Sequence, residues 1–210
     1  MKHDKIRKRL RKSYALKTQE RDARPIQSWK LEERSAFLSL LQQEQKHTLL
    51  EIGAGTGIDS KFFQDEGLDV VCIDLSPEMV QFCRQKGLTA QVMDIADLQF
   101  PTGSFDAVYA LNCLLHLPHD ELPAALNVIN RVLKPNGLFF MGVYGGYEYE
   151  GIWEEDAYEP KRFFSFYSDE HLQQVVRQVF DIHSFKRITT REKASDLHFQ
   201  SLILRKRVNG

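Results

Sequence analysis

Short apolar runs alternate along this chain with segments in which apolar residues recur every three or four positions. An apolar run of about five residues is typical of a buried strand, whereas the three-and-four spacing is typical of a helix. The runs predict strands at 47–52, 69–73, 89–93, 105–111 and 138–144. The spaced segments predict helices at 57–66, 77–86 and 119–132, the first two of which end at a glycine. Between residues 47 and 144, strands and helices are therefore expected to alternate.

The two ends of the chain depart from this alternation. Apolar residues at helical spacing between residues 14 and 43 predict an opening cover of one or two helices. The last third predicts a helix at 169–179 and two strands, 180–189 and 198–205, joined through a polar turn as an antiparallel hairpin. We divide the chain into a basic arm with a helical cover, residues 1–46, and a main domain, residues 47–210, with an insertion at about 145–168.

The first predicted strand runs into a turn in which Gly53, Gly55 and Gly57 occupy alternate positions. Glycine adopts backbone angles that side chains forbid and lets the main chain lie against a ligand, so a nucleotide-like molecule is the expected occupant. A triphosphate-binding loop needs Lys and then Ser or Thr after its last glycine, but Ile58 and Asp59 stand there. The dinucleotide pattern would need glycine at Ile58. Both of these ligand classes are therefore disfavoured.

A carboxylate follows the second predicted strand. Asp74 closes the run 69–73 at the place where nucleotide-binding α/β sheets use an acid to accept hydrogen bonds from the ribose hydroxyls. The alternative is a cap on the next helix, but Ser76 and Pro77 already supply an N-cap and a first-turn residue. We therefore interpret Asp74 as a ribose ligand.

Two phrases resemble a known family. The G-x-G-x-G turn, with Glu51 two positions before its first glycine, resembles motif I of the class I S-adenosylmethionine (SAM) dependent methyltransferases. The phrase RVLKPNGLF, residues 131–139, is also similar to that family, with Asn136 where a glycine is usual; Asn tolerates the left-handed turn conformation. The resemblance implies an α/β fold, a doubly wound seven-stranded sheet of order 3-2-1-4-5-7-6 with strand 7 antiparallel and helices on both faces. It also implies SAM as the cofactor, over the carboxyl ends of strands one to four, and S-adenosylhomocysteine as the product.

The same resemblance implies which residues hold the cofactor. Asp94 would reach the adenine amino group, and the backbone N–H of Ile95 would reach a ring nitrogen. A surface turn acid beside a core isoleucine is the alternative. The cofactor residues implied in this way are Glu51, Gly53, Ala54, Gly55, Gly57, Asp74, Leu75, Met79, Asp94, Ile95 and Asn112.

The acceptor side of the expected site is less defined. By resemblance, a loop containing His116 faces the methyl donor, and an imidazole can remove a proton from a hydroxyl or amine. The alternative is a hydrogen-bonded structural histidine, and methyl transfer from SAM makes a catalytic base optional. Aromatic and acidic residues in the insertion would suit a cationic or aromatic small molecule, or would form an aromatic lid over the core. By resemblance, an N-terminal segment with Tyr14 and Trp29 would cross the cofactor, and ordinary packing of these two side chains is the alternative. The candidate acceptor residues are Tyr14, Trp29, Tyr144, Tyr147, Trp153, Arg162 and Tyr167.

Composition agrees with a soluble globular protein, at 42% hydrophobic and 27% charged residues. The sequence has no apolar run of membrane-spanning length and no signal peptide at its charged start, so a cytoplasmic protein is expected. The three cysteines, Cys72, Cys83 and Cys113, have no short paired spacing, which predicts buried thiols and no metal site.

Charge is distributed unevenly. Residues 1–12 hold seven basic side chains and one acid, Asp4, whereas the remainder carries 21 basic and 28 acidic residues. The arm is interpreted as a solvated terminal segment or helix, with contact to nucleic acid or to an acidic surface as the alternative. The favoured function is methyl transfer to a small molecule by a monomer or homodimer. An RNA-modifying methyltransferase and a non-catalytic SAM-binding protein are the alternatives.

Overall fold

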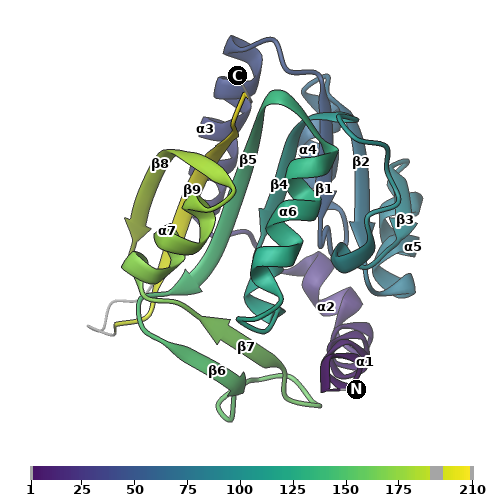
Figure 1. Cartoon of the computed structure of the whole chain (residues 1–210). Helices are drawn as coiled ribbons and strands as arrows, with labels where there is room; N and C mark the ends of the chain where they lie inside the picture. Colours follow the sequence, from purple (N-terminus) through teal and green to yellow (C-terminus); the bar gives the residue numbers. More distant parts are fainter. Residues whose placement is uncertain (1, 190–195, 209–210) are drawn as a thin grey trace.

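A seven-stranded sheet forms the centre of the molecule (Figure 1). The computed structural model describes residues 2–189 and 196–208. The main sheet contains β1 (Thr48–Ile52), β2 (Asp69–Asp74), β3 (Thr89–Val92), β4 (Phe105–Leu111), β5 (Leu133–Gly145), β8 (Phe180–Ile188) and β9 (His198–Lys206). Their order is β3-β2-β1-β4-β5-β9-β8, with β9 antiparallel to both of its neighbours. With β8 and β9 as strands 6 and 7, the order 3-2-1-4-5-7-6 is confirmed, whereas the polar turn expected before residue 198 falls largely outside the described residues.

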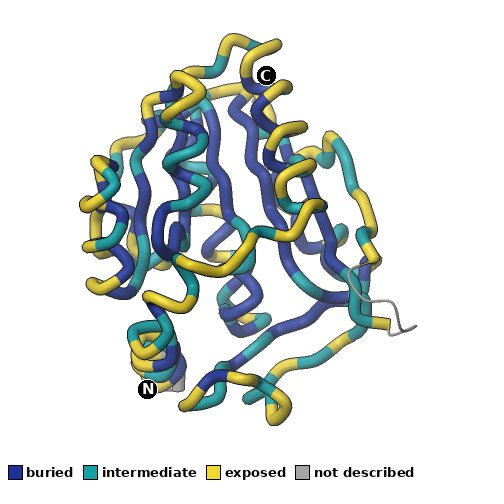
Figure 2. The backbone as a smooth tube through the Cα atoms, turned by 180° about the vertical axis from the view of Figure 1, so that it is seen from behind, coloured by how far each residue is buried: buried dark blue, intermediate teal, exposed yellow. Residues whose placement is uncertain are grey.

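Helices cover both faces of this sheet (Figures 1 and 2). The helices are α1 (Lys2–Ala15), α2 (Thr18–Ala23), α3 (Ser28–Gln43), α4 (Ile58–Asp65), α5 (Pro77–Gln85), α6 (Leu122–Val132) and α7 (Asp169–Arg177), with short 3-10 turns η1 (Ile95–Asp97) and η2 (Leu114–His116). Residues of α3, α4 and α5 pack on one face, and residues of α6 and α7 pack on the other. None of the helices in the described part of the chain is both long and apolar enough to cross a membrane.

Alternation of side chains along each strand explains why the strands are apolar throughout. In β1, Leu49 packs with Phe37 and Phe63 on the α3–α4 face, whereas Leu50 belongs to the cluster on the α6–α7 face. Both leucines are fully buried. Because successive side chains of a strand point to opposite faces, a sheet covered on both sides needs apolar residues at every position. This packing leaves the strand ends as the place where polar side chains can gather.

The bounds of one expected strand differ, and the insertion forms a small sheet of its own. The fifth strand begins at Leu133 rather than at residue 138, because Leu133 already pairs with Phe105 of β4. The insertion at 145–168 forms a separate antiparallel hairpin of β6 (Tyr149–Ile152) and β7 (Phe163–Phe166).

The basic arm forms a helix, as one of the two expected forms had it, but one face of this helix, α1, is not solvated. Ile6 and Leu10 are each only 8% exposed and pack with Phe163 of the hairpin. Among the cysteines, Cys72 and Cys83 are buried as expected, whereas Cys113 is half-buried.

Candidate functional site

A cavity of about 950 Å³, which includes the part open to solvent, lies at the carboxyl ends of the first four strands. Ile52 comes from the end of β1, Asp74 from the end of β2, Met93 from the residue after β3, and Leu111 from the end of β4. Parallel α/β sheets bind ligands at this edge because loops leave the strands in opposite directions there.

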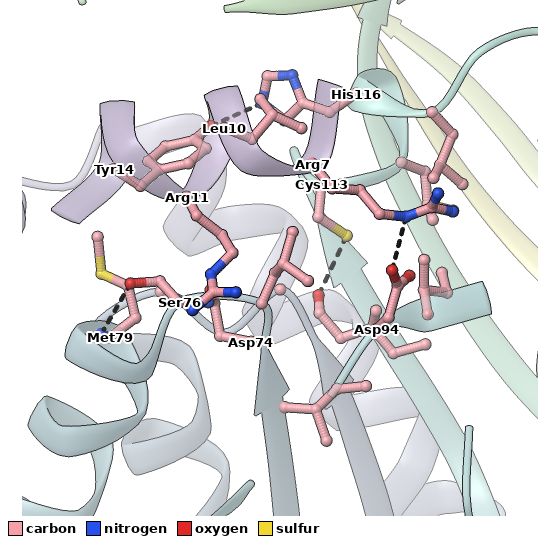
Figure 3. A pocket seen from close by; sticks show the side chains of 18 of the residues that line it. Arg7, Leu10, Arg11, Tyr14, Asp74, Ser76, Met79, Asp94, Cys113 and His116 are labelled. Carbon is pink, nitrogen blue, oxygen red and sulfur yellow. Dashed lines mark hydrogen bonds and ion pairs between the residues drawn. The ribbon is translucent and has the colours of Figure 1, made fainter. Parts of the chain in front are cut away.

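The N-terminal helix α1 forms the opposite wall (Figure 3). Its cavity-lining side chains recur at helical spacing and therefore come from one side of the helix. They are Ile6, Arg7, Leu10, Arg11 and Tyr14. Figure 3 shows Arg11 reaching from α1 toward Asp74 and Ser76. A segment that is basic in sequence thus contributes both apolar and cationic groups to the site.

The three glycines of the turn serve different purposes. Gly53 has a φ of +69°, and a Cβ there would lie 2.4 Å from the Cβ of Cys113. Gly57 has a φ of +80°, and a Cβ there would lie 2.7 Å from Leu88. At Gly55, by contrast, the nearest atom to a Cβ would be 3.8 Å away, on Arg21. Gly53 and Gly57 are therefore required by packing, whereas Gly55 keeps the backbone open beside the cavity.

Asp74 connects the glycine turn to the β2–α5 loop. Its Oδ2 accepts a hydrogen bond from Gly55 N at 2.9 Å, and its Oδ1 accepts one from Ser76 N at 2.8 Å. Burial raises the pKa of this carboxyl, against the effect of the two backbone N–H groups. The helix cap is supplied by Ser76, whose Oγ accepts a hydrogen bond from Met79 N at 3.4 Å. The carboxylate is thus held rigidly at the cavity without being the cap of α5.

Asp94 lies further along the same edge and already has partners. Its Oδ1 accepts a hydrogen bond from Ala96 N at 2.9 Å, and its Oδ2 forms an ion pair with Arg7 Nε at 2.6 Å. Arg7 also reaches Glu121 at 3.0 Å. Ile95, Leu75 and Met79 line the cavity beside these groups. The acid expected to face adenine is therefore shared with the N-terminal helix.

Asn112 has an open hydrogen-bonding site. Its backbone is held in the left-handed region, with a φ of +56°, and its N–H donates to Gly142 O at 2.8 Å. The side-chain Oδ1 is buried and has no hydrogen-bond partner among the residues that the structure describes, although Asn112 lines the cavity. A buried acceptor without a partner costs about 1–3 kcal/mol unless a ligand or water satisfies it. Together with Asp74, this orphan oxygen fits a ligand that carries several hydrogen-bond donors.

His116 is held by hydrogen bonds on both ring nitrogens. Nδ1 lies 2.7 Å from the carbonyl oxygen of Phe163, which fixes the proton on Nδ1, so Nε2 accepts from the Tyr14 hydroxyl at 2.6 Å. Burial, together with the positive charge of Arg162, lowers the pKa of His116 to about 3. The imidazole is therefore neutral at physiological pH, and the lone pair on Nε2 already accepts a hydrogen bond from Tyr14.

Arg162 completes this polar cluster. It donates to Asp156 through Nε and Nη2, at 2.8 and 2.7 Å, and Nη1 donates to the Tyr14 hydroxyl at 2.9 Å. Its guanidinium also lies 3.7 Å from the ring centroid of Tyr158. Arg162 is not part of the cavity lining, whereas Tyr14 is. The insertion is therefore connected to the cavity through the hydrogen bond from Arg162 to Tyr14.

The other predicted residues lie outside the cavity lining. Glu51 is buried beneath the turn, where Ser60 Oγ donates to it, and Ala54 packs with residues of β2 and α5. Trp29 and Tyr144 pack against Phe199. The remaining aromatic residues pack with neighbours in or beside the hairpin, and they are Tyr147, Trp153 and Tyr167.

Sequence reasoning missed Arg7, Arg11 and Arg21, all of which line the cavity. The signal available for α1 was the i, i+4, i+8 spacing of Ile6, Leu10 and Tyr14 within the basic stretch.

The fold, and the sequence over part of the chain, resemble those of known methyltransferases. Residues 50–141 match a family model described as a methyltransferase domain. Nearly the whole chain superposes on 1,6-didemethyltoxoflavin-N1-methyltransferase of Burkholderia thailandensis, solved with S-adenosylhomocysteine: the TM-score is 0.74 and the identity 20%, over 98% of this chain and 91% of that one. The chain therefore has the class I methyltransferase fold, and its residues 50–141 are similar to a methyltransferase domain.

Similar curated proteins match a shorter stretch. Ubiquinone biosynthesis O-methyltransferase of Xanthomonas oryzae pv. oryzae is 36% identical over 100 residues, which are 44% of this chain and 41% of that protein. Demethylmenaquinone methyltransferase of Tropheryma whipplei is 33% identical over 109 residues, 50% of this chain and 44% of that protein. The match thus spans less than half the length of these relatives. The fold also occurs in the [4+2]-cyclase SpnF, at a TM-score of 0.64 and 21% identity, over 78% of this chain and 75% of that one.

Proposed function

We propose that this protein is a SAM-dependent methyltransferase that acts on a small molecule. The observation that carries the proposal is Asp74, which is fixed at the end of β2 by the turn at Gly55 and presents its carboxylate to the cavity. A buried carboxylate at this place suits the two hydroxyls of a ribose. The family match of residues 50–141 and the relatives' names, all of them methyltransferases, support the same conclusion.

The residues at the carboxyl ends of the first four strands fit the cofactor. Asp74 would accept hydrogen bonds from the ribose, and Asp94 and the backbone of Ile95 would face the adenine. Asn112 Oδ1 would accept a hydrogen bond from the ammonium group at the amino-acid end of the cofactor. When bound, SAM supplies a methyl group on a positively charged sulfur, which is already activated for transfer. The chain's own contribution is then to orient the acceptor and to exclude water, and α1 is well placed to do the latter.

The acceptor would enter beside Tyr14 and His116. Because the His116 lone pair is bonded to Tyr14 and its pKa is about 3, we propose that His116 positions the Tyr14 hydroxyl instead of acting alone as a base. The surrounding surface is apolar, with Leu10, Leu114 and Leu117 in the lining. Such a lining favours an organic small molecule with one polar reacting group.

The structure gives less support to RNA as the acceptor. Two of the cationic residues of α1 are engaged within the protein: Arg7 with Asp94 and Glu121, and Arg9 with the carbonyl of Lys161. A SAM-binding protein with another activity is the second candidate, because a [4+2]-cyclase shares this fold.

Two measurements test the proposal. Calorimetric titration of the purified protein with SAM and with S-adenosylhomocysteine is expected to show binding of both. Methyl transfer from radiolabelled SAM is then measured against a panel of phenols, amines and quinone precursors, with a structured RNA as comparison. Binding without transfer to any small molecule would favour the second candidate, and absence of binding by the folded protein would refute the proposal.

A further inference from the structure

Arg21 places a positive charge beside the glycine turn. The residue belongs to α2, and its guanidinium lines the cavity at Gly55, where a Cβ would lie 3.8 Å from Nη2. Nη1 donates a hydrogen bond to the Tyr158 hydroxyl at 3.1 Å, and the cation lies 5.0 Å from the ring centroid of Tyr14. Both of these partners are neutral. They fix the position of the guanidinium without balancing its charge.

In the part of the chain that the structure describes, no carboxylate lies within ion-pair distance of Arg21. Its neighbours differ in this respect: Arg24, in the cap of the same helix, pairs with Glu20 at 3.0 Å, and Arg7 pairs with Asp94. Burial raises the pKa of Asp74, and the positive charge of Arg21 opposes that rise. The electric field of Arg21 therefore reaches Asp74 across the cavity. A half-buried guanidinium that lines a cavity and has no anionic partner is suited to an anionic group of a ligand.

We propose that Arg21 binds the carboxylate of the amino-acid end of SAM and of S-adenosylhomocysteine, an inference that rests on the proposed function. The ribose and adenine ends are assigned to the ends of β2 and β3, so the opposite end of the molecule falls toward the glycine turn and Asn112. Its carboxylate is the one anionic group of either molecule. Arg21 provides a cation for that carboxylate, and the unpartnered Oδ1 of Asn112 provides an acceptor for the neighbouring ammonium.

A pair of ligands isolates this contact. S-adenosylhomocysteine carries the amino-acid group, whereas 5′-methylthioadenosine keeps the adenosine and the thioether but lacks the carboxylate and the ammonium. Binding of both to the wild type and to Arg21→Gln is measured by calorimetry. We expect the substitution to weaken S-adenosylhomocysteine binding by about 10- to 100-fold, as loss of a charge-assisted hydrogen-bonded pair implies. Binding of 5′-methylthioadenosine should change by less than about twofold, and Arg21→Lys should recover part of the loss.

Two variants serve as controls. Arg24→Gln removes an exposed arginine near the end of the same helix and should leave both affinities unchanged. Tyr158→Phe removes the hydroxyl that orients Arg21 and keeps its charge, so it should reduce only S-adenosylhomocysteine binding, and by less than Arg21→Gln.

The outcomes separate this inference from the proposed function. If Arg21→Gln weakens both ligands equally, or neither, Arg21 does not contact the carboxylate, although the proposed function stands. If the folded wild type binds neither ligand, the proposed function itself fails, and the assignment of Arg21 fails with it.

Discussion

Replacing Asp74 with alanine tests the centre of the site. Two of the roughly four acceptor positions of its carboxylate are used within the protein, by the N–H groups of Gly55 and Ser76. The two remaining positions match the two hydroxyls of a ribose. The substitution should therefore remove both ribose hydrogen bonds, and it also frees the glycine turn from the β2–α5 loop.

The expected loss follows from these contacts. Hydrogen bonds to a charged group contribute about 1.5–3 kcal/mol each, and water that enters the vacated space offsets part of the loss. We expect Asp74→Ala to weaken binding of S-adenosylhomocysteine by about 1–3 kcal/mol, which corresponds to about 5- to 150-fold in Kd. Thermal stability should fall as well, because two backbone N–H groups lose their acceptor.

Calorimetry with S-adenosylhomocysteine measures the effect, and circular dichroism confirms that the variant is folded. Asp97→Ala is the matched control, because Asp97 is an exposed acid near the same sheet edge and does not line the cavity. The control should bind as the wild type does. A folded Asp74→Ala protein whose affinity stays within twofold of the wild type would refute the ribose assignment.

Other substitutions probe the packing around the site. Gly53→Ala should lower the free energy of unfolding by about 2 kcal/mol or more, because φ is +69° and the new Cβ would meet Cys113; an unchanged urea midpoint would contradict this. In the folded protein the pKa of His116 is about 3, below its ordinary value of 6.5. Its contribution to the free energy of unfolding is therefore complete above pH 6.5 and is lost as the pH falls toward 3. The loss is about 1.4 kcal/mol per pH unit between these values, and urea titrations at pH 7 and 5 should show a smaller decrease in His116→Gln than in the wild type. Tyr14→Phe leaves His116 Nε2 and Arg162 Nη1 without their shared partner, so it should lower the unfolding free energy by about 1–3 kcal/mol and reduce methyl transfer more than SAM affinity; equal kinetics would argue against a role of Tyr14 at the acceptor.

The strands could be predicted because they give local signals, whereas the order of the sheet was predicted from the resemblance to the methyltransferase family. Strands covered on two faces must be apolar at successive positions, as Leu49 and Leu50 are, and this makes them visible as runs. Gly53 and Asp74 follow such runs directly. A residue at the end of a parallel strand has a fixed place in the fold, so its position in space follows from its position in the sequence.

The acceptor side could not be predicted in the same way. Aromatic residues can pack against one another or face a ligand, and the sequence does not distinguish these outcomes. Trp29 packs on Phe199, and Trp153 packs on Phe166. Tyr14 reaches the cavity only because α1 crosses the sheet edge, a tertiary contact between segments about 100 residues apart.

The N-terminal helix α1 contacts both the cofactor side and the acceptor side of the proposed site. An isolated helix of 14 residues is marginal in water, so α1 depends on the packing of its apolar face against the hairpin and on the ion pairs of Arg7. One of those pairs is with Asp94, which the proposed cofactor would also approach. In the proposed function, the helix and the cofactor would therefore compete for, or share, one carboxylate. Filling of the cavity and packing of α1 would then be energetically coupled, because Arg7 of the basic start of the chain binds the same acid.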